Sequence, residues 1–355
     1  MTIRNFFFLL FFLLLNIVIS HLFYSFFLRY IDKSAYLWHA SSKREDYKKE
    51  YDFFFLGDSQ LMSGIDPNLL ENRLGKDRFL YFPRPSDQPE GIYTFLKTNL
   101  KPAQLKNKKF FINISPITTS KNGLFESHKN LQIHSSNYLF FDNSIRKLYL
   151  KKISENIFYF FSILFPILKL QTELQSHLKF IQTTTLINLH SKNLQDYLEV
   201  DTLQILQKEK EQNLFLEKEV LSKKFYWEWN SFSPNAPCQK APLHLSSEYS
   251  ATFMTDRPQA ALIWKQIGEY ILQNGGDFRF VYIPFSPESE IFFQIQHPNS
   301  PFQKTIFLLS EHFGQEKILF ISSLNLQEDD FVDAIHPNHC GARKITTELL
   351  DKWAK

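Results

Sequence analysis

The sequence predicts an α/β protein with three parts: a five-stranded parallel sheet with helices on both faces, a mostly helical insertion that caps the sheet, and one N-terminal transmembrane helix. Three observations lead to this prediction. Short apolar runs alternate with helical segments, the alternation stops between residues 120 and 255, and the chain begins with a long uncharged apolar run. The expected organisation is an anchor over residues 1–33, a first part of the α/β domain over 50–119, the insertion over 120–255, and a second part over 256–355.

The N-terminal apolar run covers residues 6–28 and carries no formal charge. About 20 apolar residues in a helix span the hydrocarbon layer of a bilayer, so this run is long enough to cross one. A cleaved signal peptide is the main alternative, but its apolar region has about 7–15 residues and ends at a small-residue cleavage site. No such site follows Leu28. A buried helix of a soluble protein is the other alternative, and we predict a single uncleaved anchor.

The orientation of the anchor depends on the charges beside it. More basic residues follow the run than precede it, which by charge counting alone favours a cytoplasmic domain. Long domains cross the membrane largely regardless of charge, however, and acidic residues such as Asp32 and Glu45 dilute the basic stretch. We therefore expect a single-pass membrane protein whose domain faces the periplasmic or extracytoplasmic side.

The composition excludes several classes of protein. Apolar residues make up 44% of the chain and charged residues 22%, which excludes an intrinsically disordered protein. The net charge of +3 is too small to indicate a nucleic-acid-binding protein. The two cysteines, Cys238 and Cys340, permit one disulfide without requiring it, and two unrelated thiols are the favoured interpretation.

The predicted strands are short apolar runs that end at turn residues, as buried parallel strands do. They are Asp52–Leu56, Phe79–Phe82, Lys109–Ile114, Phe278–Ile283 and Lys317–Ser322. Five helices are predicted, and two of them carry an end signal, a proline start at Pro67 and a glycine stop at Gly275. The five are a helix opened by Asp66 and Pro67, then Glu90–Asn99, Pro258–Gln273, Phe302–Phe313 and Asn338–Trp353.

The insertion shows three features. The apolar run Ile157–Leu168 is too short to span a bilayer and is interrupted by Pro166, so we expect it to pack against the sheet. A membrane-facing or acyl-binding surface is the alternative for this run. A mixed-charge helix is expected near Lys208–Lys224, and the aromatic cluster Phe225–Trp229 is expected in a core, with a sugar-stacking surface as the alternative.

Two short motifs carry candidate chemistry. The first is Gly57-Asp58-Ser59-Gln60, directly after the first predicted strand. Ligands of open α/β sheets bind at the carboxyl ends of strands, so Ser59 lies where a nucleophile is useful. The second is Asp333-Ala-Ile-His336-Pro-Asn, after the last predicted strand. A spacing of three residues lets Asp333 orient the His336 imidazole, whose other ring nitrogen then faces a serine.

These motifs resemble those of the SGNH (GDSL-type) hydrolase superfamily, in particular bacterial membrane-anchored SGNH-like proteins. That family has its nucleophile in Gly-Asp-Ser after the first strand and its acid and base in Asp-x-x-His near the C-terminus. Ser59, Asp333 and His336 match these positions in the same chain order. The resemblance covers residues 51–100, the third strand and residues 258–353, and leaves the insertion out. It implies a serine hydrolase fold with a Ser-His-Asp triad and no cofactor.

The resemblance is incomplete at the oxyanion hole. The family supplies a glycine N–H after the second strand, whereas this chain reads Phe82-Pro-Arg-Pro-Ser-Asp-Gln-Pro-Glu-Gly91. Ser86 or Asp87 is a substitute N–H donor there, and Arg84 is an alternative anion-binding group. The family's Gly-x-Asn-Asp block is also absent. The substitutes for it are Asn113 and Ser115, which lie two apart on the third strand, and Asp58 completes the expected binding set.

Metal binding is a further alternative, because four potential ligands lie within eight residues: Asp333, His336, His339 and Cys340. Pro337 and the lack of a second such cluster argue against a closed zinc site, and we expect no metal. His339 is expected to be an ordinary surface histidine.

The sequence therefore predicts a membrane-anchored esterase or O-acyltransferase acting on a cell-envelope glycan or lipid. The expected partners are this acyl substrate, the membrane and, for acyl transfer, a membrane protein that donates the acyl group. No nucleic-acid partner is expected. The alternative is a catalytically weak or inactive SGNH-like protein that binds or scaffolds other envelope components.

Overall fold

The computed structural model describes residues 3–27, 44, 46–120, 157, 161–162, 164–170, 211, 238, 254, 257–321 and 325–353. The chain divides into two compact units. One unit contains residues 1–42 and 130–218, and the other contains residues 43–129 and 219–355. The helix expected near Lys208–Lys224 and the aromatic cluster Phe225–Trp229 lie outside the described residues, except for Glu211.

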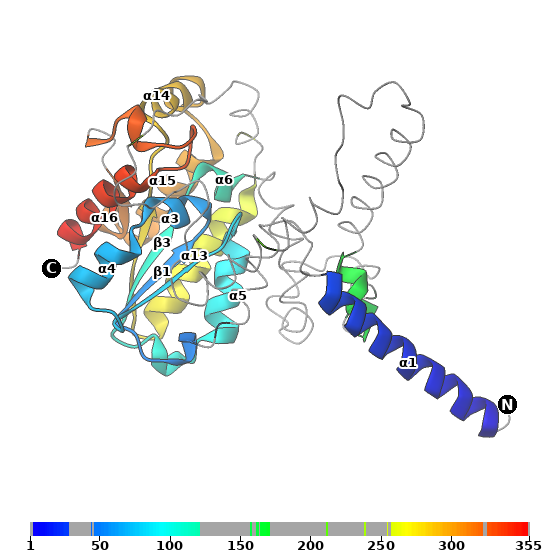
Figure 1. The fold of residues 1–355 in the computed structure, drawn as a ribbon. Coiled ribbons are helices and arrows are strands. Elements are labelled where there is room, and N and C mark those ends of the chain that lie inside the picture. Colours follow the sequence, from blue (N-terminus) through cyan, green and yellow to red (C-terminus); the bar gives the residue numbers. More distant parts are fainter. Residues whose placement is uncertain are drawn as a thin grey trace, which may run out of the picture. The chain divides into compact units, whose positions relative to one another are not determined.

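The second unit is built on a five-stranded sheet in which every neighbouring pair of strands is parallel (Figure 1). Its strands are β1 (Phe53–Gly57), β2 (Phe79–Pro83), β3 (Lys109–Asn113), β4 (Asp277–Tyr282) and β5 (Ile318–Phe320). The strand order is β2-β1-β3-β4-β5, one of the two common doubly wound orders. The α/β prediction is thus confirmed, and each predicted strand is present within a few residues of its predicted bounds.

Helices cover both faces of this sheet, as Figure 1 shows. On one face α16 (His339–Trp353) packs against α3 (Ser59–Gly64) and α4 (Pro67–Leu74). On the other face α13 (Pro258–Gln273) packs against α5 (Pro89–Asn99) and α15 (Pro301–Phe313). Helices on both faces bury both sides of the strands, which is why the strands read as continuous apolar runs.

Phenylalanine side chains fill the centre of the sheet. Phe54 on β1 stacks on Phe110 of β3 with ring centres 4.6 Å apart, and Phe55 stacks on Phe111 at 4.7 Å. All four side chains are buried. These pairs are direct neighbours in the strand register. Part of the phenylalanine content of the chain, 38 of 355 residues, therefore serves the core of this unit, where aromatic rings bury large areas.

Two short elements differ from the predictions. The last strand, β5, is only three residues long, shorter than the predicted Lys317–Ser322. The helix α14 (Pro287–Gln296) is an additional helix that the apolar pattern does not predict. Prolines at 284, 287, 298 and 301 surround it and suggest a loop. Pro287, however, occupies the first helical position, where the missing N–H of proline costs no hydrogen bond.

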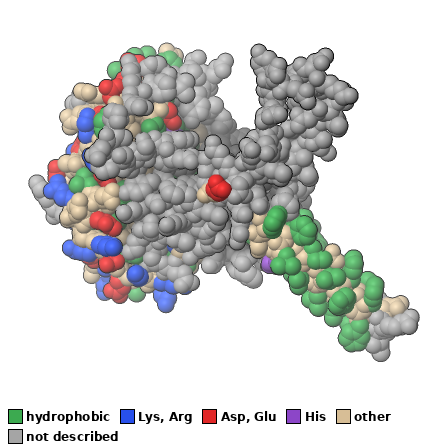
Figure 2. Space-filling view, in the orientation of Figure 1, with side chains coloured by type: hydrophobic (Ala, Val, Ile, Leu, Met, Phe, Trp, Pro, Cys, Tyr) green, Lys and Arg blue, Asp and Glu red, His purple; other side chains and the backbone are tan. Residues whose placement is uncertain are grey.

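In the first unit, α1 (Ile3–Phe27) is long and apolar enough to cross a membrane over Asn5–Phe26. Figure 2 shows hydrophobic side chains along its visible face, and most of its described side chains are exposed. Its polar side chains bond within the unit: Asn16 donates to the carbonyl of Phe12, and the Ser20 hydroxyl accepts from the N–H of Ile167. The prediction of one membrane-crossing helix is confirmed in length and composition.

Candidate active site

The turn after β1 presents Ser59. Asp58 precedes α3 as its N-cap, and the Asp58 carboxylate accepts the N–H of Gln60 at 2.8 Å. Gly57 allows β3 to approach closely, since an added Cβ would lie only 2.6 Å from the Cβ of Asn113. The strand order reverses between β1 and β3, so Ser59 lies at the point where doubly wound proteins bind ligands.

The segment that carries Asp333 and His336 is closed by its own hydrogen bonds. Phe331 and Pro337 form an antiparallel bridge, and the N–H of Val332 donates to the carbonyl of His336 at 2.9 Å. The Asp333 carboxylate accepts two N–H groups, from Ile335 at 2.9 Å and from His336 at 2.8 Å. An aspartate that bonds to the backbone ahead of it in this way fixes a tight turn. We call residues 331–338 the His336 turn.

The structure brings the three residues of the predicted triad together. The Asp333 carboxylate lies 2.8 Å from Nδ1 of His336, and Nε2 of His336 lies 3.0 Å from the hydroxyl oxygen of Ser59. Ser59 and His336 are 277 positions apart in the chain, so the expected approach of these two side chains is confirmed. With its Nδ1–H bonded to Asp333, the imidazole presents Nε2 to the serine hydroxyl as a proton acceptor.

The two acidic residues next to this contact have opposite pKa shifts. Burial acts to raise the pKa of Asp333, but the hydrogen bond and the charge of His336 outweigh burial and lower it. Burial raises the pKa of the fully buried Asp58 to about 6, against the bonds that it accepts from Gln60 and Ser115. At neutral pH both carboxyl groups are ionised.

Asn338 and Gln60 support the site through hydrogen bonds, although the two motifs do not assign a role to either residue. The side-chain carbonyl of Asn338 accepts the N–H groups of Cys340 and Gly341, and its amide donates to the carbonyl of Asp329 at 2.6 Å. The Gln60 amide donates to the carbonyl of Ile335 at 3.2 Å. Asn338 thus joins the His336 turn to α16, and Gln60 joins it to α3. An asparagine just before a helix is a sequence signal for an N-cap.

Asn113 and Ser115 lie beside the Ser59 turn, but both form other hydrogen bonds. The fully buried Asn113 amide donates to the carbonyl of Val281 on β4 at 3.3 Å. The Ser115 hydroxyl lies 3.2 Å from the Asp58 carboxylate, to which it donates. Ser115 also caps α6 (Pro116–Thr119). These two predicted oxyanion residues therefore hold the end of β3 against β4 and against Asp58.

The segment after β2, residues 84–90, which includes the first two residues of α5, reaches the same edge of the sheet. The backbone N–H of Arg84 donates to the carbonyl of Gly57 at 2.8 Å, which places this loop next to the Ser59 turn. The N–H of Asp87 donates to the carbonyl of Arg84, so Asp87 is not a free N–H donor. Ser86 lies between them, half-buried, with a φ of 55° in the left-handed region that favours glycine. We call residues 84–90 the Ser86 loop.

The Arg84 side chain also stabilises this loop. Its guanidinium lies 2.7 Å from the Asp87 carboxylate, and both side chains are buried. Burial raises the pKa of Asp87 to about 6, while the charge of Arg84 acts to lower it. Arg84 is therefore engaged in an internal ion pair, and the Ser86 backbone is the part of the loop that resembles the expected glycine.

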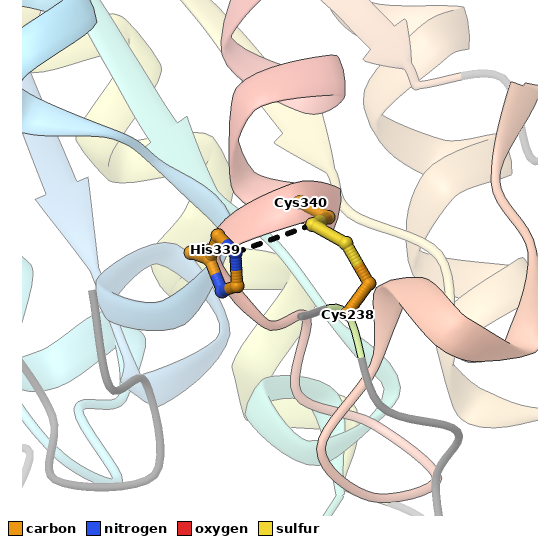
Figure 3. Close-up of side chains that lie close together, drawn as sticks. All are labelled: Cys238, His339 and Cys340. Atoms are coloured by element: carbon orange, nitrogen blue, oxygen red, sulfur yellow. Dashed lines mark hydrogen bonds between the residues drawn. A yellow bond between two sulfur atoms is a disulfide. The ribbon is translucent and has the colours of Figure 1, made fainter. Parts of the chain in front are cut away.

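The two cysteines form a disulfide, so the prediction of two unrelated thiols is wrong (Figure 3). Their Cα atoms lie 6.1 Å apart, within the range that a disulfide spans, although 102 positions separate them in sequence. His339 contacts this disulfide, with Nε2 3.3 Å from Sγ of Cys340, and it is buried rather than at the surface. A separation of this length leaves no local signal from which the pairing can be read.

Within the described residues, the same three side chains form a cluster of potential metal ligands. Sγ of Cys238, a ring nitrogen of His339 and Sγ of Cys340 lie within 4.8 Å of one another. The disulfide uses both sulfur atoms, and metals bind thiolates, so these residues do not fit a metal in the disulfide form. Asp333 instead bonds to His336, and His336 bonds to Ser59.

Comparison with family models and with curated proteins finds no match for this chain.

Proposed function

We propose that the protein is a membrane-anchored serine hydrolase of the SGNH type, an esterase or O-acyltransferase acting on a cell-envelope glycan or lipid. The observation that carries this proposal is the hydrogen-bonded series from Asp333 through His336 to Ser59. A serine hydroxyl is a weak nucleophile until an adjacent base takes its proton, and an imidazole oriented by a carboxylate is such a base.

In the proposed reaction, the Ser59 oxygen attacks the ester carbonyl carbon while Nε2 of His336 takes the hydroxyl proton. The tetrahedral intermediate breaks its bond to the alcohol oxygen, and His336 gives the proton to that leaving group. Water or an acceptor hydroxyl then attacks the acyl-serine, again losing its proton to His336, which returns it to Ser59. Water completes hydrolysis, and a hydroxyl completes acyl transfer. Asp333 stabilises the imidazolium throughout.

The backbone N–H groups of Ser59 and Ser86 are the best supported oxyanion donors. Within the described part of the chain, neither N–H forms a hydrogen bond, and the Ser86 loop contacts Gly57 beside the nucleophile. Asn113 and Ser115 are less suited, because they bond to Val281 and Asp58. Loss of one oxyanion donor typically costs about 10²–10³ in rate, so this pair has a measurable role.

Labelling with a fluorophosphonate probe tests the proposal directly. Wild-type full-length protein in detergent is expected to form a covalent adduct, and Ser59→Ala is expected to form none. Ser63→Ala is the matched control, because Ser63 is a buried serine on the same helix that donates to the carbonyl of Gln60. It should label like the wild type. Absence of labelling in folded wild-type protein would remove the enzymatic proposal.

The anchor and the disulfide together support a domain outside the cytoplasm. Disulfides persist in oxidising compartments and are rare in the cytosol. The Cys238–Cys340 bond therefore favours the extracytoplasmic orientation over the one that charge counting suggests. Protease added to spheroplasts is expected to digest the domain and leave the N-terminal segment. Protection until lysis would reverse the orientation.

A non-catalytic SGNH-like envelope protein is the second candidate. It is favoured by the missing glycine in the Ser86 loop and by the engaged donors of Asn113 and Ser115. Such a protein would use the same sheet edge to bind an acylated glycan or lipid without turnover. Binding of an esterified ligand by wild type and by Ser59→Ala alike, without probe labelling of either, is the result expected for this candidate.

A further inference from the structure

The backbone of Ser86 is held in an unfavourable conformation. A non-glycine residue with a φ of 55° is uncommon, and such conformations persist only where the surrounding structure imposes them. The local turn, in which the N–H of Asp87 donates to the carbonyl of Arg84, is a single hydrogen bond. A second backbone bond, from the N–H of Arg84 to the carbonyl of Gly57, holds the start of the loop, and buried charged side chains add further contacts.

The first layer of contacts is the ion pair between Arg84 and Asp87 within the loop. The Arg84 side chain is 8% exposed and the Asp87 side chain 1%, so both charges are removed from water. Gly91, on the first turn of α5, allows the helix to close on this pair, because an added Cβ would collide with the Asp87 carboxylate. The Asp87 carboxylate also accepts the N–H of Gln88 at 2.9 Å, which fixes the entry into α5.

The second layer comes from a residue far away in the sequence. Arg257, at the N-cap of α13, donates from its guanidinium to the side-chain oxygen of Gln88 at 3.0 Å and forms an ion pair with Glu90. Both charged side chains are at most 6% exposed. Burial lowers the pKa of Arg257 to about 10, so the guanidinium keeps its charge at neutral pH. Arg257 and Gln88 are 169 positions apart, and the predicted insertion lies between them.

A buried ion pair costs desolvation energy that its own attraction only partly offsets, so two in one loop are weak evidence for stability. They do fix geometry, because each guanidinium donates in a rigid plane and each acceptor must meet it. We propose that Arg257 is a positioning residue for the oxyanion site: through Gln88 and Glu90 it fixes the Ser86 loop so that the N–H of Ser86 faces the carbonyl attacked by Ser59. This inference rests on the proposed hydrolase function.

Arg44 provides a matched control within the same unit. It is also a buried arginine, 3% exposed, and it donates to the carbonyl of Tyr81 at 2.7 Å. Its guanidinium lies 5.1 Å from the ring centre of Phe82. Arg44 therefore contacts strand β2 just before the loop, whereas Arg257 contacts the loop itself. Replacing either removes a buried cation near β2, but Arg257 bonds to the side chains of Gln88 and Glu90, whereas Arg44 donates to a backbone carbonyl of the strand.

The first experiment measures kcat and KM for p-nitrophenyl acetate with full-length Arg257→Ala, Arg257→Lys, Glu90→Gln and Arg44→Ala. Arg257→Ala is expected to lower kcat by about 10- to 100-fold with KM changed less than about threefold, since an oxyanion donor acts in the transition state. Arg257→Lys should recover part of the loss, and Glu90→Gln, which keeps the shape of the side chain, should give a smaller one. Arg44→Ala should keep kcat within about twofold. Equal kcat for the two alanine variants would overturn the inference.

The second experiment separates this inference from the hydrolase proposal. Amide hydrogen exchange of peptides covering residues 84–90 is expected to rise at least about tenfold in Arg257→Ala and to stay near the wild-type rate in Arg44→Ala. Faster exchange in a chain that never labels with fluorophosphonate would leave the positioning role intact and end the hydrolase proposal. Unchanged exchange in Arg257→Ala would end the positioning role, whatever the activity.

Discussion

The His336 turn and the Ser86 loop lie at the same edge of the sheet but are built differently. Within the His336 turn, Asp333 bonds to backbone groups two and three residues ahead, and Asn338 ties the turn to the helix that follows. The Ser86 loop instead depends on buried charges, one of which, Arg257, comes from beyond the predicted insertion. The His336 turn is thus held mainly by hydrogen bonds between residues close in sequence, and the Ser86 loop by contacts that include a residue far away in sequence.

This difference predicts that the two elements respond differently to substitutions elsewhere in the chain. A turn held by local hydrogen bonds keeps its shape when distant parts of the chain change, so substitutions there act mainly on the chemistry. A loop held by a distant buried arginine loses its shape when that contact is lost, so its function depends on residues that touch no substrate. The most severe losses are therefore expected at the reacting side chains, and milder ones at the residues that support them.

Ser59→Ala and His336→Ala should each lower kcat/KM for p-nitrophenyl acetate by about 10⁴–10⁶, and the double variant should lose no more than either alone. The reason is that nucleophile and base act as a unit. His339→Ala is the matched histidine control, because His339 contacts Cys340 rather than Ser59. A severe loss in His339→Ala together with an active His336→Ala would mean that the triad is wrongly assigned and that the metal interpretation of this segment is the better one.

Asp333→Asn should cost less, about 10²–10⁴ in kcat. Asparagine keeps an oxygen that can accept the N–H groups of Ile335 and His336, so the turn is expected to survive while the charge opposite Nδ1 is lost. Far-ultraviolet circular dichroism and thermal unfolding check that the fold is retained. A variant that unfolds would show that the Asp333 charge, and not the local turn, holds this element.

Removal of the disulfide should affect stability more than chemistry. The bond closes a loop of 102 positions, and native disulfides of this kind contribute about 2–5 kcal/mol to the free energy of unfolding. Cys238→Ser with Cys340→Ser should therefore lower Tm in detergent, while kcat stays within about threefold because the His336 turn is held locally. Wild-type protein that shows two free thiols under non-reducing conditions would contradict the pairing.

Asp58 is electrostatically linked to both elements: the charge of His336 acts to lower the pKa of Asp58, and the charge of Asp58 acts to raise the pKa of Asp87. The folded-state pKa of Asp58, about 6, is above the value of about 3.9 for an exposed aspartate. Below pH 4 the carboxyl is protonated in both states. As the pH rises towards 6, the unfolded chain loses its proton first, so the contribution of Asp58 to the free energy of unfolding falls through this window.

Asp58→Asn should remove this pH dependence and still cap α3, because asparagine is a good N-cap. Relative to wild type, the variant is expected to gain about 2 kcal/mol in free energy of unfolding between pH 4 and 6.5. Denaturant unfolding at several pH values measures the difference. Asp66→Asn, at the buried N-cap of α4, is the matched control. Parallel curves for wild type and Asp58→Asn would show that burial of Asp58 does not raise its pKa.

Much of the fold could be predicted from the sequence, because strand and helix signals are local. The runs around Phe54 and Phe110 are apolar on both faces, as strands between two helical layers must be. Proline and glycine signals at Pro258 and Gly275 mark the ends of α13 almost to the residue. Helix α14 is harder to predict, because its flanking prolines are equally consistent with a loop.

The candidate site, like the fold, can be predicted from the sequence only in part. The residue types and spacing in Gly-Asp-Ser and Asp-x-x-His are sufficient to single out Ser59, Asp333 and His336. The spacing says nothing about where the donors of Asn113 and Ser115 point, since their bonds to Val281 and Asp58 depend on how β3 packs. Short-range patterns therefore identify the three residues of the proposed triad but not the hydrogen bonds of the polar side chains around them.

Local sequence is enough to specify the long apolar N-terminal helix, the succession of strands and helices, and the three residues of the proposed triad. Each of these follows from residue types within a few positions of one another. Tertiary packing sets the strand order, the 3.0 Å approach of Ser59 to His336, the Cys238–Cys340 pairing and the contact of Arg257 with the Ser86 loop. The last three of these features join segments 102 or more positions apart, and such contacts form only when burial of the whole apolar core brings the segments together.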